Sequence, residues 1–318
     1  MALIPGLLLQ GIQMALVLLL APLLVAFVRK MKARLQRRRG PSLVQPYRDL
    51  LRLLRKEAVL AGNASWLFRV APYLVFAAIW VAAALVPTYA AGLPFGGAAD
   101  LIVITGLLAS ARFFTALAGL DVGTSFGGIG SSRDMMIASL AEPAMLMLVF
   151  AISLLVGTTS LSSIALHILT EEIGLRVSLG LALVGLVIVA IAETGRIPVD
   201  NPATHLELTM VHEAMLLEYS GRHLALIELA AATKLLLFLS LIGAIFVPWG
   251  LALPGGGPGA LLFGLAAYLV KLAVGGALLA VLETAIAKMR VFRVTEFLGA
   301  ALLLGLLATL LRFVSGGL

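Results

Sequence analysis

The sequence has no cysteine and few charged residues. Without cysteine, the chain can form neither disulfides nor thiolate-held metal clusters, so any redox centres it works with belong to other chains. Only 12% of its 318 residues are charged and 61% are hydrophobic, whereas a soluble domain is about one quarter charged. Apolar runs of about 18 or more residues recur along the chain, which is typical of a polytopic, all-α membrane protein.

We predict eight transmembrane helices in one integral membrane domain over residues 1–318. Turn signals rich in proline and glycine, such as residues 248–250 and 254–258, separate the apolar runs. The predicted helices cover approximately residues 3–28, 70–90, 100–120, 135–157, 177–193, 223–247, 260–283 and 296–314.

Basic residues are distributed very unevenly between the predicted loops. If the loop 29–69 is cytoplasmic, cytoplasmic segments hold 18 of the 23 Lys and Arg residues, and outer loops hold only Arg176. This asymmetry predicts that both termini face outward. The basic charge therefore reflects topology, with contact to anionic lipid or a docking surface for a cytoplasmic partner, and no nucleic-acid binding is expected. Within the loop, leucines alternate with basic residues over 46–57, which predicts an amphipathic helix at the interface.

A second cytoplasmic loop, 194–222, is unusually acidic. Residues 193–219 contain five of the sixteen acids and two of the four histidines, which indicates proton handling or partner docking. His212 and Glu213 begin like a zinc-protease helix, but Leu216 occupies the position of the second ligand. We therefore predict no metal site and no catalytic residues in this chain.

Ionisable residues inside predicted helices are costly and are functional candidates. At about 1.5 Å per residue, Arg112 and Glu142 both lie about 12 Å from the cytoplasmic face, so these two side chains could pair. On the same scale Glu228 lies about 8 Å deep, and Lys234 and Lys271 about 17 Å deep. The outer half is nearly free of charge. This pattern favours a half-channel that takes protons from the cytoplasm, although ion pairs that only fix helix packing explain it too.

Two separated motifs resemble the complex I membrane subunit 1 family. Residues 36–41 (QRRRGP) with 45–49 (QPYRD) are similar to its first cytoplasmic loop, and 193–200 (ETGRIPVD) with 218–219 (EY) to its acidic loop. The sequence of residues 201–215 and 287–293 resembles the branch that serves membrane-bound nickel–iron hydrogenases, such as the formate hydrogenlyase type.

The resemblance implies a membrane anchor and proton-coupling subunit in a bacterial or archaeal cytoplasmic membrane. It would dock hydrogenase large and small subunits, which carry nickel–iron and iron–sulfur centres, and relay protons toward antiporter-like membrane subunits. The resemblance places Glu142, Glu193, Asp200, Glu207 and Glu218 in the proton path, and depth and charge add Arg112, Glu213, Glu228, Lys234 and Lys271. The expected docking residues are Arg37, Arg38, Arg39, Gly40, Pro41, Tyr47, Arg48, Asp49, Lys56 and Arg196.

Three other functions remain open. The chain could be the quinone-chamber subunit of NADH:quinone oxidoreductase, although the residues after Asp200 depart from that branch. It could be a free-standing ion transporter, against which the nearly uncharged outer half argues. It could also be a purely structural anchor.

Overall fold

The protein is built from helices, as predicted. The computed structural model describes residues 3–170, 177–200 and 210–316, and within these ranges the only β-pairing is two isolated bridges. The helices are α1 (Leu3–Leu35), α2 (Gln45–Leu54), α3 (Trp66–Leu85), η1 (Pro94–Gly97), α4 (Leu101–Asp121), α5 (Ser125–Val156), α6 (Leu161–Thr170), α7 (Val177–Glu193), α8 (His212–Leu216), α9 (Gly221–Phe246), α10 (Pro258–Ala285) and α11 (Val291–Gly316).

Seven helices of the described ranges are long and apolar enough to cross a membrane. They are α1, α3, α4, α5, α9, α10 and α11, and each overlaps a predicted span. The remaining predicted span, 177–193, is present as the shorter apolar helix α7 of 17 residues. The chain is therefore a multi-pass membrane protein.

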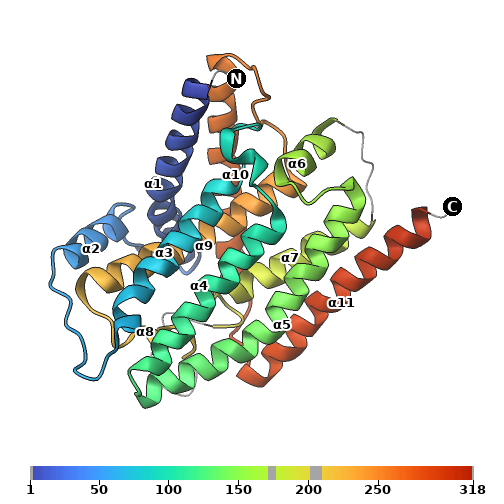
Figure 1. Ribbon diagram of the computed structural model, residues 1–318. Helices are drawn as coiled ribbons and strands as arrows, with labels where there is room; N and C mark the ends of the chain where they lie inside the picture. The colour runs from blue at the N-terminus through green and yellow to red at the C-terminus, as the bar shows by residue number, and fades with distance from the viewer. Residues whose placement is uncertain (1–2, 171–176, 201–209, 317–318) are drawn as a thin grey trace.

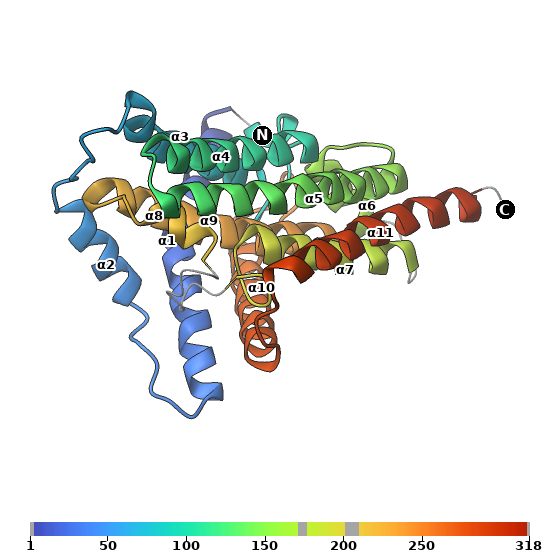
Figure 2. The same ribbon diagram turned by 90° about the horizontal axis from the view of Figure 1, so that it is seen from below.

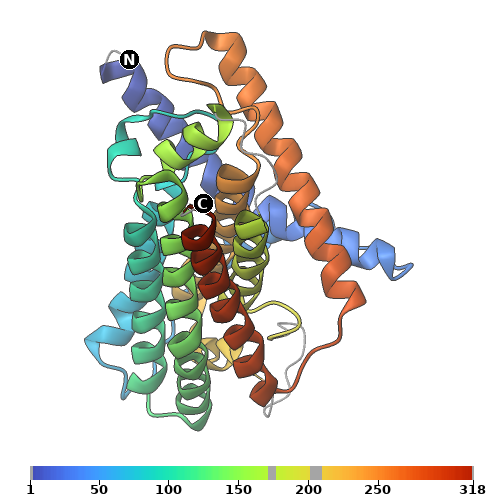
Figure 3. The same ribbon diagram turned by 90° about the vertical axis from the view of Figure 1, so that its right-hand side faces the viewer.

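Helix α9 occupies the centre of the bundle. It packs against α1 and α3, and its side chains Leu236, Leu237 and Leu241 are completely buried. Figure 1 shows α3, α4 and α5 running beside one another, whereas α1, α2 and α10 project to one side (Figure 2). Figure 3 shows α10 crossing the edge of the bundle. The N-terminal end of α1 and the C-terminal end of α11 point toward the same side of the bundle (Figure 1). That this side faces outward stays a prediction.

The amphipathic helix expected over 46–57 is present as α2, which ends at Leu54. Pro46 lies in its first turn, where a proline costs no backbone hydrogen bond. The helix packs against α1 and α9, and the hydroxyl of Tyr47 donates a hydrogen bond to the carbonyl of Leu19. Arg48 and Arg52 are exposed.

Helices α4 and α5 touch through their backbones at one end. A Cβ atom placed on Gly127 would lie 2.1 Å from the carbonyl oxygen of Gly119, closer than real Cβ contacts allow. Near this contact, Ser131 donates a hydrogen bond of 2.9 Å to the carbonyl of Ala116. Residues 125–134 precede the predicted helix 135–157 but form the start of α5, with Thr124 as the N-cap.

We expect Gly127→Ala to destabilise the protein by about 1–3 kcal/mol, because the added methyl group separates two helices that have no side chain to repack. The matched control is Gly128→Ala, since Gly128 has open space at its Cβ position. The measurement is the thermal unfolding midpoint of the detergent-solubilised protein. Equal midpoints for the two variants contradict the close contact.

Candidate functional site

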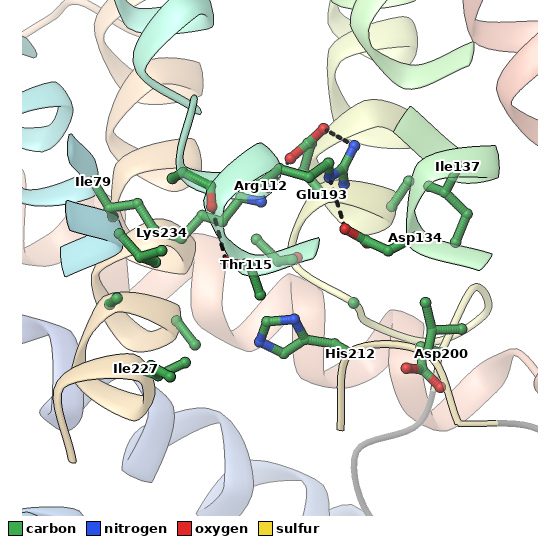
Figure 4. Close-up of a pocket in the computed structure, with 18 of the residues that line it drawn as sticks. Ile79, Arg112, Thr115, Asp134, Ile137, Glu193, Asp200, His212, Ile227 and Lys234 are labelled. Atoms are coloured by element: carbon green, nitrogen blue, oxygen red, sulfur yellow. Dashed lines mark hydrogen bonds and ion pairs between the residues drawn. The ribbon is translucent and has the colours of Figure 1, made fainter. Parts of the chain in front are cut away.

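Four charged side chains from four helices form a buried ion-pair network. Arg112 of α4 places Nη1 2.8 Å from Oε1 of Glu193 at the end of α7. Its Nε lies 3.5 Å from Oδ2 of Asp134 in α5, and Nζ of Lys234 in α9 lies 2.6 Å from Oε2 of Glu193. Figure 4 shows Arg112 between the two carboxylates. The four side chains are only 4–14% exposed.

The position of Glu193 explains why it has two cationic partners. It is the last residue of α7, and a carboxylate at a helix C-terminus faces the negative end of the helix dipole. Burial adds a desolvation cost, which only close opposite charges offset. Arg112 and Lys234 contact different oxygens of this carboxylate, so the network carries two positive and two negative side chains and is balanced.

A cavity of about 70 Å³ lies against this network. It is lined by all four members of the network and by Asp200 and His212, which lie beneath the network in Figure 4. A volume of this size accommodates several water molecules, and its polar lining supplies hydrogen-bond partners for them. The arrangement therefore gives the ion pairs access to water inside the membrane domain.

A second, larger cavity of about 400 Å³ lies toward α2. Its lining includes Arg29, Asp49 and Arg52, together with Glu213 and Glu228. The two cavities share lining residues, namely Thr194, Gly195, Asp200, His212 and Ala231. A thin wall of shared residues therefore separates the larger polar cavity from the buried ion pairs.

A further set of ion pairs ties the loop 194–200 to α1 and α10. Glu283, which is buried, lies 2.6 Å from Nζ of Lys32 and 3.1 Å from Nη1 of Arg196. Nζ of Lys288 donates a hydrogen bond of 2.9 Å to Oδ1 of Asp200. These contacts fix the loop that forms part of the wall between the two cavities.

The structure brings together most of the predicted proton-path residues and separates others. Arg112, Glu193 and Lys234 form the network, while Asp200, Glu213 and Glu228 line one or both cavities. Glu218 is half-buried in the turn after α8. Lys271 lines a different cavity beside α10. Glu207 lies outside the described residues.

Two predicted positions need correction. Arg112 does not form an ion pair with Glu142, which its depth allowed, but with Glu193 and Asp134, because depth along a helix does not fix the direction of a side chain around it. Glu142 is half-buried, and its place in the proton path stays a prediction. Arg196, predicted as a docking residue, points inward to Glu283 with a side chain only 14% exposed.

The other expected docking residues lie toward the surface. Arg37, Arg38, Arg39, Pro41, Arg48 and Lys56 are exposed, and Gly40, Tyr47 and Asp49 are partly buried. Asp49 forms an ion pair of 3.1 Å with Arg52 one turn along α2. The surface is thus strongly basic.

Sequence reasoning missed Asp134, Glu283, Lys32 and Lys288. Asp134 was one residue outside a predicted span, yet it continues the buried face of Ile137, Ala138 and Ala141 on α5. That helical spacing was a usable signal for Asp134. Glu283 and its partners come from distant parts of the sequence, which gave no signal for their pairing. The described residues contain no group of three or more side chains placed to hold a metal ion.

Comparison with known proteins identifies the family. The sequence profile described as NADH dehydrogenase matches residues 9–314. The chain belongs to the NADH dehydrogenase subunit 1 family. It is therefore a membrane subunit related to those of complex I-like complexes.

Two relatives come from Escherichia coli. Formate hydrogenlyase subunit 4 is 34% identical over 279 residues, which cover 88% of this chain and 90% of the relative. Hydrogenase-4 component C is 34% identical over 240 residues, which cover 76% of this chain and 75% of the relative. Both relatives are named as parts of hydrogen-metabolising complexes.

The fold is also found in a solved structure. A chain of the membrane-bound sulfane sulfur reductase, an archaeal respiratory membrane complex, superimposes with a TM-score of 0.83 and 20% identity. The match covers 97% of this chain and 99% of that one. At this level of identity the likeness establishes the shared fold and nothing more.

We expect His212 to make the protein less stable in acid. Burial lowers the pKa of this histidine below its ordinary value of 6.5, with Lys234 and Arg112 acting in the same direction and Asp134 and Asp200 opposing them. The unfolded chain therefore binds a proton more readily than the folded one, and stability falls as the pH drops below about 6.5. The thermal unfolding midpoint should decrease over this range. The decrease should be smaller for His212→Gln, and identical pH profiles contradict the assignment.

Proposed function

We propose that the protein is the membrane anchor and proton-coupling subunit of a complex I-like, membrane-bound nickel–iron hydrogenase in a bacterial or archaeal cytoplasmic membrane. Its family membership and its similarity to formate hydrogenlyase subunit 4 support this assignment. The observation that carries it is the buried ion-pair network beside two polar cavities that share a wall.

The larger cavity serves as the proton reservoir. Its acids Asp49, Glu213 and Glu228 and its bases Arg29 and Arg52 hold water beside the basic cytoplasmic surface. This mixture of charges keeps the cavity hydrated without an excess of either sign. Protons therefore reach the wall between the two cavities through water.

His212 and Asp200 carry protons through that wall, because both line the two cavities. A histidine has two ring nitrogens and can accept a proton on one while releasing it from the other. The lowered pKa of His212 keeps the ring neutral at neutral pH and favours the release of any proton that it accepts. Its imidazole then delivers the proton to water next to Glu193.

The ion pairs at Glu193 form the switch of the relay. An arriving proton neutralises the carboxylate of Glu193 or Asp134. The ion pair of that carboxylate with Arg112 or Lys234 then weakens, and the net charge of the network changes. Redox chemistry in the docked arm, where the nickel–iron and iron–sulfur centres of partner subunits belong, alters the potential at the same network. The proton then leaves the network and continues laterally toward antiporter-like subunits, with Glu142 on the path.

The basic loop 29–69 is the docking surface for the peripheral arm. Its exposed residues Arg37, Arg38, Arg39, Arg48 and Lys56 lie between α1 and α3. The ion pairs of Glu283 with Lys32 and Arg196 then connect the loop to the wall of the cavities. The docking surface and the proton path are thereby physically connected.

Glu193→Gln should abolish proton translocation while hydrogen evolution continues. The remaining cations are left without full compensation, which for a buried pair costs about 3–5 kcal/mol, so the charge-balanced double variant Glu193→Gln/Lys234→Met should recover the lost stability but not translocation. The measurement is hydrogen-linked proton uptake in vesicles that contain the complete complex. The control is Glu296→Gln, which changes an exposed acid on α11.

Full translocation by the Glu193→Gln complex overturns the proton-coupling role. Loss of assembly in both the single and the double variant indicates a structural anchor instead. Quinone-dependent activity that quinone-site inhibitors block moves the protein to the quinone branch, and transport by the purified single chain identifies a free-standing transporter.

Replacing Arg37, Arg38 and Arg39 by glutamine should weaken docking of the hydrogenase subunits, because it removes three positive charges from the exposed loop. Their recovery with the affinity-tagged chain after mild detergent extraction should fall several-fold, and more steeply at high salt. Arg293→Gln is the control, since Arg293 is exposed on α11 outside the loop 29–69. Unchanged recovery at all salt concentrations contradicts the docking surface.

A further inference from the structure

Lys271 lies apart from the ion-pair network and near the middle of α10. Its side chain is half-buried, and the ion pairs between described residues do not include it. An unpaired lysine at this depth is costly in a membrane helix. Something other than a neighbouring acid of the described chain must therefore solvate its ammonium group.

A small cavity of about 10 Å³ lies beside Lys271. It is closed by two loops, which pair through hydrogen bonds of 2.9 Å from Ala91 N to Ala252 O and from Ala252 N to Tyr89 O. Helix α10 approaches these loops closely, since a Cβ on Gly264 would lie 2.2 Å from Tyr89 O. The cavity is thus fixed in shape and has room for about one water molecule.

Polar atoms converge on this cavity from three elements. The hydroxyls of Ser240 on α9 and Tyr268 on α10 form a buried hydrogen bond of 2.8 Å. Thr88, from the loop after α3, is only 4% exposed, and its Oγ1 has no hydrogen-bond partner among the described residues. All three residues line the cavity together with Lys271.

A buried hydroxyl without a partner costs about 1–3 kcal/mol, and buried water normally satisfies such groups when two to four polar partners surround it. Thr88, Lys271 and the Ser240–Tyr268 pair provide that number of partners. The lysine stem packs beside Gly243, since a Cβ there would lie 3.8 Å from Lys271 Cδ, an ordinary van der Waals distance. The site is therefore built for a water molecule that contacts the lysine.

We propose that this cavity binds one water molecule, which hydrogen-bonds Thr88 Oγ1 and the Ser240–Tyr268 pair and solvates the Lys271 ammonium. The water keeps Lys271 charged within the membrane. Lys271 is then a second cationic site, outside the Glu193 network. Ser240 lies six residues beyond Lys234 on α9, about 9 Å along the helix and on a different face. The role of this cationic site in coupling rests on the function proposed above.

The direct test is a high-resolution map of the assembled complex. We expect density for a water molecule between Thr88 and Lys271 in the wild-type protein and in Thr88→Ser, which keeps the hydroxyl. The density should be absent in Thr88→Val, which has the same shape without it. A wild-type map without this density, or a Thr88→Val map that retains it, overturns the water site.

The functional test is proton translocation by the same complexes in vesicles. Lys271→Met and Thr88→Val should reduce translocation several-fold, while Lys271→Arg should preserve it because a guanidinium stays charged without the water. For the same reason Thr88→Val should have no effect in the Lys271→Arg background, whereas a packing defect would persist there.

The two proposals can fail separately. Undiminished translocation by Lys271→Met, together with loss in Glu193→Gln, removes Lys271 from coupling and leaves the proposed function intact. A wild-type complex that binds the water but translocates no protons refutes the proposed function and leaves the water site standing.

Discussion

The buried carboxylate of Glu193, held between Arg112 and Lys234, is the interaction on which the membrane domain depends. Each of these groups alone is costly in a low-dielectric interior, and only their mutual contact offsets the cost. Because they come from α4, α7 and α9, with Asp134 from α5, four helices are fixed relative to one another. The same contact places titratable groups where membrane proteins usually have none.

Hydration and packing make opposite demands on this region. Apolar packing gives the bundle its stability, as in the fully buried leucines of α9, but proton transfer needs water. In the described residues, the ion-pair network and its polar neighbours lie against two cavities, and ion pairs of Arg196 with Glu283 and of Asp200 with Lys288 hold the wall between them. The proton path proposed here is short, and its narrowest point is a loop rather than a helix.

The sequence predicted the helices well and the ion pairs between their side chains poorly. Long apolar runs identified the membrane helices, and the alternation of leucine and arginine identified α2, because both patterns depend on local periodicity. The acidic loop was singled out as a functional candidate because charge is scarce elsewhere. Depth alone could not identify the partner of Arg112, because helix rise sets depth but not rotation. The predicted helix 135–157 begins after the first turns of α5 and therefore excluded Asp134. Glu283 meets Lys32 and Arg196 across long sequence separations, which no local pattern reveals.

The backbone contact between Gly119 and Gly127 also bears on how the chain enters the bilayer during synthesis. Helices α4 and α5 are neighbours in sequence, so this contact closes them into a hairpin that brings Arg112 to Asp134. A hairpin inserted as one unit carries its arginine and aspartate into lipid as a neutralised pair, which avoids the cost of inserting either charge alone. Helices α7 and α9 follow later in the sequence, and their Glu193 and Lys234 complete the network.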